Sequence, residues 1–533
     1  MMPARGPRYG VGLFLLSIAA CGSSERGASA HGDSTDAGSS SAATPDGAQP
    51  SQHSDAGSDP SDDASTAGPL SLAWVRTFTG PGHQSAAAVF AAGDDVWATT
   101  EISEPTTFGS GEAGEVTIDA ETVSVVHASL DAAGSLQSAV RSSKRTGGSI
   151  NGGTLSGPVA SLKGGARLVG AGVVGTREFA SGQPKATVVT APQATPGSGT
   201  LSPQWSTLGR YDASGALAWM HTITGSGYVG LAGVSAFDDG AFVMAGSYTG
   251  SVSLGPSTTF SAASAADVPA FVARADATGS VTWASGIKGT VSMYSLDIDA
   301  SGASYVAGDV RGVSIFGPGE ANETTITPAA TPTVGAGFVA RYAPNGKLAW
   351  AQSAGDEVVI SAVVRTAGGL VVSGSFAGSR TVFGTPRKAA GASGADRDGF
   401  VAKLDEATGG LVWFEQLTGT GDEIVDVLRV DPSGQVWAIG WSSSSSLALD
   451  QNGSATGADA DWTFAITLDD AGAARRFERI ATHASVGSIA FAPSGAVTIG
   501  GQAFPGATVG GKAVNVAGVA DGFVARFSAA SPR

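Results

Sequence analysis

Short apolar stretches recur along most of the chain, and clusters of turn-forming residues separate them. The stretches are rich in β-branched and aromatic residues, which is typical of strands. Examples are Val427–Val430, Val436–Gly440, Thr463–Leu468 and Arg475–Ile480. They are joined by Asp-Pro-Ser-Gly at 431–434, by Asp-Ala-Ser-Gly at 212–215, or by equivalents of these. Asp, Pro, Ser and Gly are favoured in tight turns. The pattern therefore predicts successive β-hairpins.

The hairpins belong to a repeat of the form Phe-Val-Ala-Arg-x-Asp-x-x-Gly-x-Leu-x-Trp, which is clearest from Phe338 to Trp350. Its first position falls at Phe271, Phe338, Phe400, Phe464 and Phe523, and its Trp position at Trp74, Trp219, Trp283, Trp350, Trp413 and Phe477, mostly 59 to 67 residues apart. A weaker copy runs from Val126 to Leu136, and a Pro/Gly/Thr-rich loop near Pro184–Pro203 is expected to interrupt the rhythm. Seven copies result. Four strands per copy are typical of a β-propeller blade.

The two ends of the repeated region complement each other. Leu72–Phe78 matches the fourth strand of the unit, whereas Phe523–Phe527 matches the third. Pairing of these stretches would supply the strand that the last copy lacks. We therefore expect residues 70–533 to form an all-β, seven-bladed β-propeller of four-stranded blades, closed by pairing of the N-terminal and C-terminal strands.

The composition fits a β-rich protein with an acidic surface. Charged residues make up only 14% of the chain and glycines number 78, which points to many turns. The formal net charge is −16. This balance argues against nucleic acid as a partner, because its phosphates are themselves negative.

A different composition precedes the repeats. Residues 22–69 contain no large apolar residue and carry a net charge of −7. Such a segment cannot bury enough apolar surface to offset its conformational entropy. We expect residues 21–69, which begin with Cys21, to be a disordered tether rich in Ser, Ala, Asp and Gly.

The first residues have the pattern of an export signal, with Arg5 and Arg8 before the short apolar stretch Val11–Ala20. A transmembrane helix needs roughly 20 apolar residues, so residues 1–20 are expected to be a cleaved signal peptide. Ile18 to Cys21 resembles the lipobox of bacterial lipoproteins. The resemblance implies cleavage before Cys21, the only cysteine, and attachment of a lipid to its thiol. It places the protein in the bacterial cell envelope, at the outer membrane, held to the membrane by its lipid.

Gly337–Arg341 and Asp431–Gly434 resemble the seven-bladed β-propeller repeat of bacterial surface proteins. That resemblance implies the fold, and family members are mostly surface proteins of unassigned role. The stretches from Asp276 to Trp283 and from Asp405 to Trp413 are also similar to the tryptophan-docking motif of quinoprotein dehydrogenases. Those enzymes have eight blades and commonly a vicinal cysteine pair, which this sequence lacks. The recurring tryptophans are better interpreted as residues that pack between blades.

Four long segments connect strands two and three of their blades and are expected to cluster on one face, opposite the short turns. These segments are Thr249–Ala270, Arg311–Gly337, Ala377–Gly399 and Ser442–Trp462. Loops on a rigid scaffold often carry function, so this face is the candidate functional face. The links between blades on the same face contain two carboxylate pairs, Asp356 with Glu357 and Asp422 with Glu423. These pairs are weak candidates for cation binding, and the alternative is that they cap turns. The stretch Asp297–Gly302 is interpreted as a strand that runs into a turn.

No arrangement of residues typical of catalysis is recognisable, and the histidines show no metal-ligand spacing. We expect no cofactor. The favoured function is a binding or scaffold module that presents the long-loop face to an unknown protein or glycan. The alternative is an envelope enzyme with its site on that face.

Overall fold

The computed structural model describes residues 69–82, 84–120, 123–145, 156–192, 204–329, 335–391, 396–450, 453–456 and 461–528, so Cys21, the signal segment and the tether lie outside the described residues. Within these ranges nearly all regular structure is strand, and the one helical element is a 3-10 turn, Lys163–Gly165. No helix in the described ranges is long and apolar enough to cross a bilayer. The prediction of an all-β fold is confirmed.

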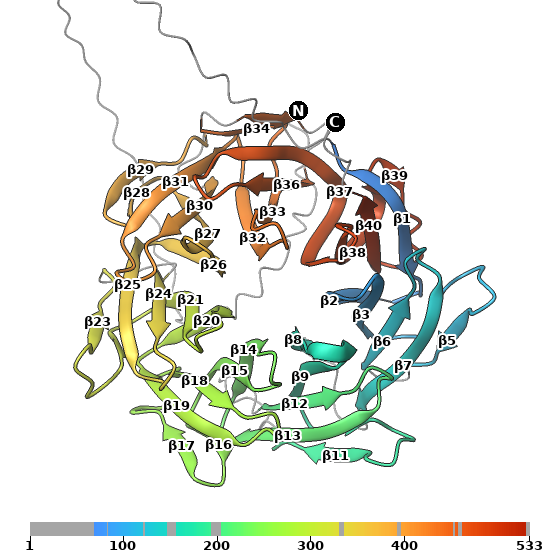
Figure 1. Ribbon diagram of the computed structural model, residues 1–533, viewed down its shortest axis with the longest axis horizontal. Helices are drawn as coiled ribbons and strands as arrows, with labels where there is room; N and C mark the ends of the chain where they lie inside the picture. The colour runs from blue at the N-terminus through green and yellow to red at the C-terminus, as the bar shows by residue number, and fades with distance from the viewer. Residues whose placement is uncertain are drawn as a thin grey trace, which may run out of the picture.

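The strands pair antiparallel into four-stranded blades that stand in a ring (Figure 1). We number the blades along the chain and give their strands from the centre outward. Blade 1 contains β2 (Gln84–Ala92), β3 (Asp95–Ile102), β6 (Ser124–Leu130) and β7 (Leu136–Arg145), and blade 2 contains β8 (Ser156–Ser161), β9 (Arg167–Val173), β12 (Trp205–Tyr211) and β13 (Leu217–Gly225). Blade 3 contains β14 (Val229–Ala236), β15 (Phe242–Tyr248), β18 (Ala270–Ala275) and β19 (Val281–Lys288).

The second half of the ring repeats this order. Blade 4 contains β20 (Val291–Ile298), β21 (Ser304–Val310), β24 (Ala336–Tyr342) and β25 (Leu348–Asp356), and blade 5 contains β26 (Val358–Thr366), β27 (Gly369–Ala377), β30 (Arg397–Leu404) and β31 (Leu411–Thr418). Blade 6 contains β32 (Glu423–Val430), β33 (Val436–Ser442), β36 (Trp462–Leu468) and the first part of β37 (Ala474–Phe491). Blade 7 contains the second part of β37, β38 (Val497–Val509), β40 (Asp521–Ser528) and β1 (Ser71–Phe78).

The first and last described strands lie side by side. β1 pairs antiparallel with β40, with Ser71 opposite Ser528 and Phe78 opposite Gly522. The N-terminal strand therefore supplies the outer strand of the C-terminal blade, as the strand order predicts. The strands of the ring do not form one closed sheet, since they divide into separate sheets. Side-chain packing and short stretches of backbone pairing between blades therefore hold the ring together.

The four long segments, expected to be loops, contain regular structure. Each contains a short hairpin, and three of these hairpins pair with the outer strand of the preceding blade. The hairpins are β16–β17 (Ser251–Gly255, Thr258–Ser261) on β13, β22–β23 (Ser314–Phe316, Thr324–Ile326) on β19, β34–β35 (Ser446–Leu449, Ser454–Thr456) on β31, and the separate pair β28–β29 (Ser379–Val382, Thr385–Lys388). An outer strand has an unpaired edge, and a hairpin that pairs with it satisfies those backbone groups.

An equivalent hairpin forms part of the stretch near Pro184, where an inserted loop is expected. β10 (Thr176–Phe179) and β11 (Thr187–Thr190) pair with each other, and β10 pairs with β7. Pro184 lies in the connection between them, so it belongs to a regular part of the blade and not to an extra loop. Residues 193–203 of that stretch lie outside the described residues. Blade 1 has the short pair β4–β5 (Thr106–Phe108, Val116–Ile118), and in blade 7 the two-residue β39 (Lys512–Ala513) pairs with β38.

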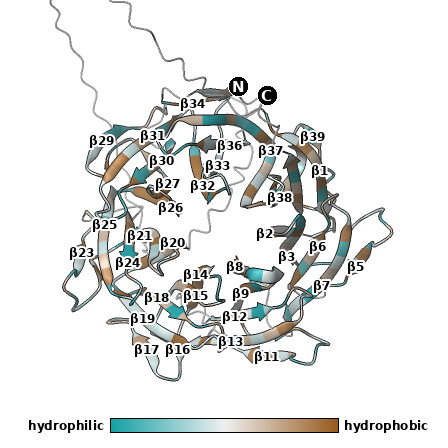
Figure 2. Ribbon diagram, in the orientation of Figure 1, coloured by the Kyte–Doolittle hydropathy of each residue, from teal (hydrophilic) through white to brown (hydrophobic). Residues whose placement is uncertain are grey.

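Apolar residues follow the strands (Figure 2) and meet between blades. The phenylalanines at the first position of the repeat are completely buried; they are Phe271, Phe338, Phe400, Phe464 and Phe523. Phe338 packs on Phe316 of the neighbouring hairpin, with ring centroids 4.9 Å apart. Full burial of such a side chain contributes roughly 1.5 to 3 kcal/mol, so these contacts are a main source of stability.

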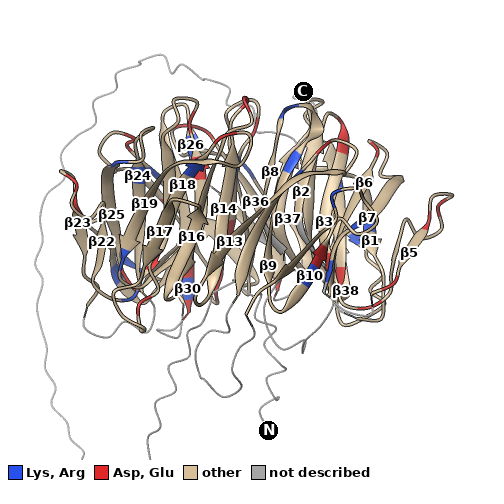
Figure 3. Cartoon of the chain, turned by 90° about the horizontal axis from the view of Figure 1, so that it is seen from below, with Lys and Arg blue, Asp and Glu red and all other residues tan. Residues whose placement is uncertain are grey.

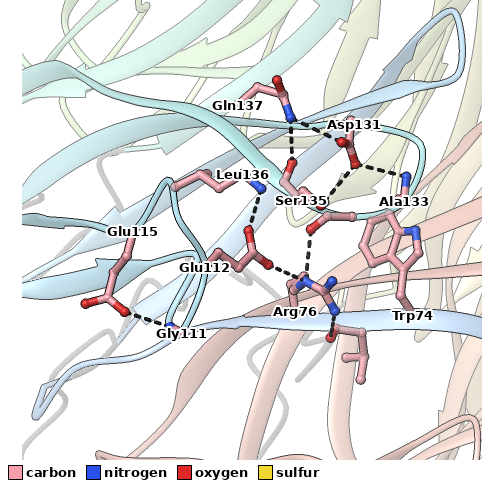
Figure 4. A network of polar contacts seen from close by, with 12 residues as sticks. Trp74, Arg76, Gly111, Glu112, Glu115, Asp131, Ala133, Ser135, Leu136 and Gln137 are labelled. Atoms are coloured by element: carbon pink, nitrogen blue, oxygen red, sulfur yellow. Dashed lines mark hydrogen bonds and ion pairs between the residues drawn. The ribbon is translucent and has the colours of Figure 1, made fainter.

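The repeated tryptophans each join a blade to the next one. The indole Nε1 of Trp74 donates to the carbonyl oxygen of Ala132 at 3.0 Å, and Figure 4 shows Trp74 lying against the turn that contains Ala133. The other members of this set donate in the same way; the pairs are Trp219 to Ala277, Trp283 to Pro344, Trp350 to Glu406 and Trp413 to Asp470. The interpretation of the tryptophans as residues that pack between blades agrees with these contacts.

A glycine in each receiving turn lies against the indole ring. Gly346 has φ 83°, and a Cβ atom placed on it would lie 2.6 Å from the ring of Trp283. Asp131 caps the equivalent turn of blade 1, where its Oδ1 accepts from the backbone N–H groups of Ala133 and Ser135. The Asp-x-x-Gly-x-Leu-x-Trp spacing therefore has a physical basis, because the aspartate shapes the turn and the glycine leaves room for the tryptophan of the preceding blade.

One assignment in the repeat is wrong by one residue. Trp350 lies opposite Arg341, and the residue in the same position of blade 6 is Arg476, which lies opposite Thr467. Phe477 therefore does not occupy the Trp position; it packs on Phe464, with centroids 6.1 Å apart. A shift of one residue moves a side chain to the other face of a sheet.

In blade 1, alignment by strand pairing shows that a small residue, Ser138, occupies the Trp position of the repeat. Ser138 lies opposite Ser129, as Trp350 lies opposite Arg341. Leu136 pairs with Leu130 and so corresponds to the Leu of the repeat. The Trp contact to the next blade is thus made by five of the blades within the described residues.

Candidate functional site

A cavity with a volume of about 310 Å³ lies between blades 6 and 7. Its lining consists of Trp441, Asp461, His483, Ala484, Phe504, Pro505 and Val519. These residues lie in the outgoing ends of strands two, in the connections that follow them, and in β37 where it passes from blade 6 to blade 7. The cavity therefore opens on the face that carries the hairpin connections, which we call the hairpin face. We call the cavity the blade 6/7 pocket.

Two polar residues of this pocket have an unusual backbone conformation. Asp461 has φ 74° and His483 has φ 48°, both in the left-handed region. The N–H of His483 donates to the carbonyl oxygen of Asp461 at 3.0 Å, so the two strained positions support each other. Left-handed residues other than glycine cost of order 1 to 3 kcal/mol and occur often at functional sites. The conformation brings a carboxylate and an imidazole to the same rim.

The other walls of the pocket are apolar. Trp441 ends the second strand of blade 6, and Phe504 and Pro505 lie in β38 of blade 7. Val519 is 67% exposed at the mouth. Aromatic walls with a few polar groups are typical of small-molecule sites. The pocket can hold a ring with an apolar face and polar substituents.

The first predicted carboxylate pair belongs to the link between blades 4 and 5. Asp356 is the last residue of β25, and its Oδ1 accepts from the N–H of Ala329 at 3.1 Å. Glu357 has φ 56° and forms an ion pair with Arg380. Both carboxylates therefore have partners within the protein that shape the turn.

The second pair is divided between a turn and the interior. Asp422 Oδ1 accepts from the N–H of Arg397 at 3.0 Å. Glu423 is completely buried, and its Oε1 accepts from the hydroxyls of Ser442 at 3.1 Å and Ser444 at 2.5 Å. Burial raises the pKa of the Glu423 carboxyl to about 7, and the two serine hydrogen bonds oppose this rise. Of the four predicted residues, Glu423 is the one in an unusual environment.

Sequence reasoning missed the buried neighbour of Glu423. Asp398, in β30 of blade 5, is completely buried, and burial raises the pKa of its carboxyl. Its Oδ2 accepts from Gln416 Nε2 at 2.6 Å and from the N–H of Ala390 at 3.0 Å. A signal was present in the sequence, because Asp-Gly-Phe-Val recurs at 398–401 and 521–524, whereas blade 4 has alanine at the position of the aspartate. Within the described ranges no three residues of the types His, Cys, Asp and Glu gather closely enough to hold a metal ion.

Acidic residues occur at both ends of the blades (Figure 3). Figure 3 shows Asp and Glu in the turns of both faces when the ring is seen from the side.

A second cavity of about 450 Å³ lies between blades 1 and 2 at the short turns and is lined largely by small residues. Its aromatic wall is Trp97, over which the guanidinium of Arg167 lies at 3.9 Å from the ring centroid. Burial lowers the pKa of Arg167 to about 10. Because this cavity offers a single aromatic wall, the blade 6/7 pocket is the stronger candidate site.

No protein-family model matches the chain, and no curated protein sequence matches it. Among solved structures, the chain is similar to a gluconolactonase from Xanthomonas campestris (12% identity, TM-score 0.30, covering 70% of this chain and 86% of that chain). It is also similar to the calcium-binding protein regucalcin from Agrobacterium tumefaciens (14% identity, TM-score 0.26, 58% and 80%) and to a sialidase from Trypanosoma rangeli (7% identity, TM-score 0.28, 84% and 55%). TM-scores this low do not support any inference about function. The fold described above is inferred from the strand pairing alone.

Proposed function

We propose that the chain is an exported, lipid-anchored bacterial propeller that acts as a binding module through the blade 6/7 pocket. The observation that carries this proposal is the pocket itself, where two aromatic side chains face a carboxylate and an imidazole on the hairpin face. Concave, mostly apolar sites with a few convergent polar groups are typical of ligand binding.

The occupant that best fits this chemistry is a sugar unit of a glycan. A sugar ring has an apolar face of C–H groups that can stack on Trp441 or Phe504, and its hydroxyls can donate to Asp461. A cavity of about 310 Å³ suits one or two such rings better than a broad protein surface. The alternative occupant is a protein that inserts a single side chain into the pocket, and the test below distinguishes it from a glycan.

The proposed anchor is the lipid on Cys21, in the cell envelope and at the outer membrane. Its support is the lipobox-like stretch and the acidic segment of residues 22–69 that precedes β1. A flexible chain of 48 residues has an end-to-end distance of roughly 35 to 42 Å. A tether of this kind would hold the hairpin face away from the lipid, where it can meet a glycan, and the acidic charge excludes nucleic acid as the expected partner.

An array of envelope and extracellular glycans tests this function. The full chain should bind a subset of glycans, and Trp441→Ala should lose that binding because the stacking wall is removed. Val412→Ala is the matched control, since Val412 is 57% exposed on the outer strand of blade 5, away from the pocket. Equal glycan signals from all three proteins, or none from any, would rule out the pocket as a glycan site.

One observation favours an enzyme as the second candidate. His483 and Asp461 are held together by strained backbone at the rim, and histidine is the commonest general base. In this alternative the bound glycan would be cleaved or modified. Turnover of an array ligand that disappears in His483→Ala would favour the enzyme, whereas binding without turnover supports the binding module.

A further inference from the structure

Two buried carboxylates lie close enough to influence each other between blades 5 and 6, since the charge of Asp398 raises the pKa of the Glu423 carboxyl. Asp398 comes from the third strand of blade 5, and Glu423 begins the first strand of blade 6. Glu423 pairs with Ser442, and neighbouring residues of a strand point to opposite faces, so this site lies across the blade 6 sheet from Trp441 of the blade 6/7 pocket. We propose that Asp398 and Glu423 together bind a hard divalent cation, for which Ca²⁺ is the best fit.

Each carboxylate uses only one of its oxygens within the protein. Asp398 Oδ2 accepts from Gln416 and Ala390, and Glu423 Oε1 accepts from the two serine hydroxyls. Asp398 Oδ1 and Glu423 Oε2 are buried and accept no hydrogen bond. Buried polar atoms nearly always have partners, so two such oxygens in one place require an explanation.

Among the described residues, no positively charged group is a main cause of the pKa shifts of this pair. The charged groups that act on Glu423 are Asp398 and Asp422, and the one that acts on Asp398 is Asp450, so each of these neighbours is acidic. Two buried carboxylates without a counter-charge are strongly unfavourable. A divalent cation would neutralise both.

The neighbouring guanidinium is engaged elsewhere. Arg397 Nε donates to Ser375 Oγ at 3.0 Å, and its Nη2 donates to the carbonyl oxygen of Ser375 at 3.2 Å. Arg397 therefore does not contact the free oxygen of either carboxylate. Within the described residues an ion from solvent is the remaining source of positive charge.

The arrangement favours a cation over a shared proton. One shared proton would leave a net negative charge buried on the pair, whereas a divalent cation balances both carboxylates. Ca²⁺ takes 6 to 8 oxygen ligands, including neutral carbonyls and waters, at roughly 2.3 to 2.6 Å. The carbonyl oxygen of Glu423 lies beside Gly399, the residue after Asp398, at 3.4 Å from where a Cβ would stand. A neutral ligand is thus available next to both acids.

Thermal unfolding of the full chain, first treated with EDTA and then supplied with CaCl₂ or MgCl₂ at constant ionic strength, tests this site. Ca²⁺ should raise the melting temperature by several degrees, and Asp398→Asn or Glu423→Gln should weaken Ca²⁺ binding at least about tenfold. Asp356→Asn is the matched control, because Asp356 belongs to the equivalent Gly-Asp-Glu stretch of the preceding link and should leave the Ca²⁺ effect unchanged.

A second readout does not depend on the stability of these variants. Trp462 Nε1 donates to the carbonyl oxygen of Ser444, whose hydroxyl contacts Glu423, so this indole lies next to the proposed ion. Tb³⁺ in place of Ca²⁺ should emit on tryptophan excitation, and Trp462→Phe should remove most of the emission while Ca²⁺ still competes. The site is refuted if Ca²⁺ changes neither the melting temperature nor the Tb³⁺ emission of the wild type. It is also refuted if Asp398→Asn and Glu423→Gln respond to Ca²⁺ as the wild type does.

Discussion

Replacement of Gly346 by alanine should disrupt one contact between neighbouring blades. Gly346 is in the left-handed region, and the added Cβ would lie 2.6 Å from the ring of Trp283 in the preceding blade. The ring cannot simply withdraw, because its Nε1 donates to the carbonyl oxygen of Pro344 in the same turn at 3.0 Å. The change therefore strains the backbone and forces a tryptophan out of place.

The structure supplies a matched control that separates these two effects. Gly319 has φ 81°, close to the 83° of Gly346, but a Cβ on it would have no atom within 4 Å. The left-handed backbone alone costs about 1 to 2 kcal/mol for alanine. Displacement of a packed ring adds about 1 to 3 kcal/mol. We therefore expect Gly346→Ala to lower the free energy of unfolding by about 2 to 5 kcal/mol and Gly319→Ala by about 1 to 2 kcal/mol.

Urea unfolding followed by tryptophan fluorescence measures this difference. Both variants should keep the strand content of the wild type in far-UV circular dichroism, so that the comparison concerns stability and not misfolding. If the two variants lose the same free energy within about 0.5 kcal/mol, the Trp–Gly contact does not join the blades as described.

Three further predictions concern other parts of the chain. Burial raises the pKa of the Asp426 carboxyl to about 7 from 3.8. As the pH rises, the folded state therefore keeps the proton on this carboxyl up to a higher pH than the unfolded state does. The stability of the wild type relative to Asp426→Asn should fall by about 2 to 4 kcal/mol as the pH rises from 4 to 8 in urea unfolding, and an unchanged difference would contradict the burial of a charge there. Cys21→Ser should abolish incorporation of radioactive palmitate and release the protein from membranes; equal labelling of both proteins would exclude the lipid anchor. Cysteines placed at Val75 and Ala525, which face each other in β1 and β40, should crosslink, and deletion of β1 should lower the melting temperature; failure of both would show that this pairing does not close the ring.

The features that sequence analysis predicted well depend on local signals. The turn at Asp431 can be recognised because its Oδ1 caps the N–H groups of Ser433 and Gln435, which favours Asp at the first position of the turn. The stretch Asp297–Gly302 is a strand that runs into a turn, as expected. Asp297 lies near the end of β20, and Asp299 Oδ1 in the turn accepts from the N–H of Ala303. The pairing of the terminal strands followed from the order of strands in the repeat. Such inferences need only turn chemistry and a count of strands.

The features that were missed depend on contacts between distant segments. Strands of three residues such as Thr324–Ile326 are too short to show alternation, so their hairpins looked like loops. Phe477 was aligned one residue away from Arg476 because β37, the outer strand of blade 6, has no tryptophan to fix the register.

The two sites posed the same difficulty. The pocket joins Trp441, His483 and Phe504 from separate strands that share no motif. Asp398 and Glu423 belong to different blades, and only the packing of the blades brings them together.

The central claim is that the blade 6/7 pocket binds a glycan, and a calorimetric titration of the strongest array ligand tests it most directly. The wild type and Val412→Ala should bind this ligand with the same affinity. Phe504→Ala should bind it about 10 to 100 times more weakly, since loss of an aromatic wall costs roughly 1.5 to 3 kcal/mol of burial. Equal affinity of the wild type and Phe504→Ala would contradict the account.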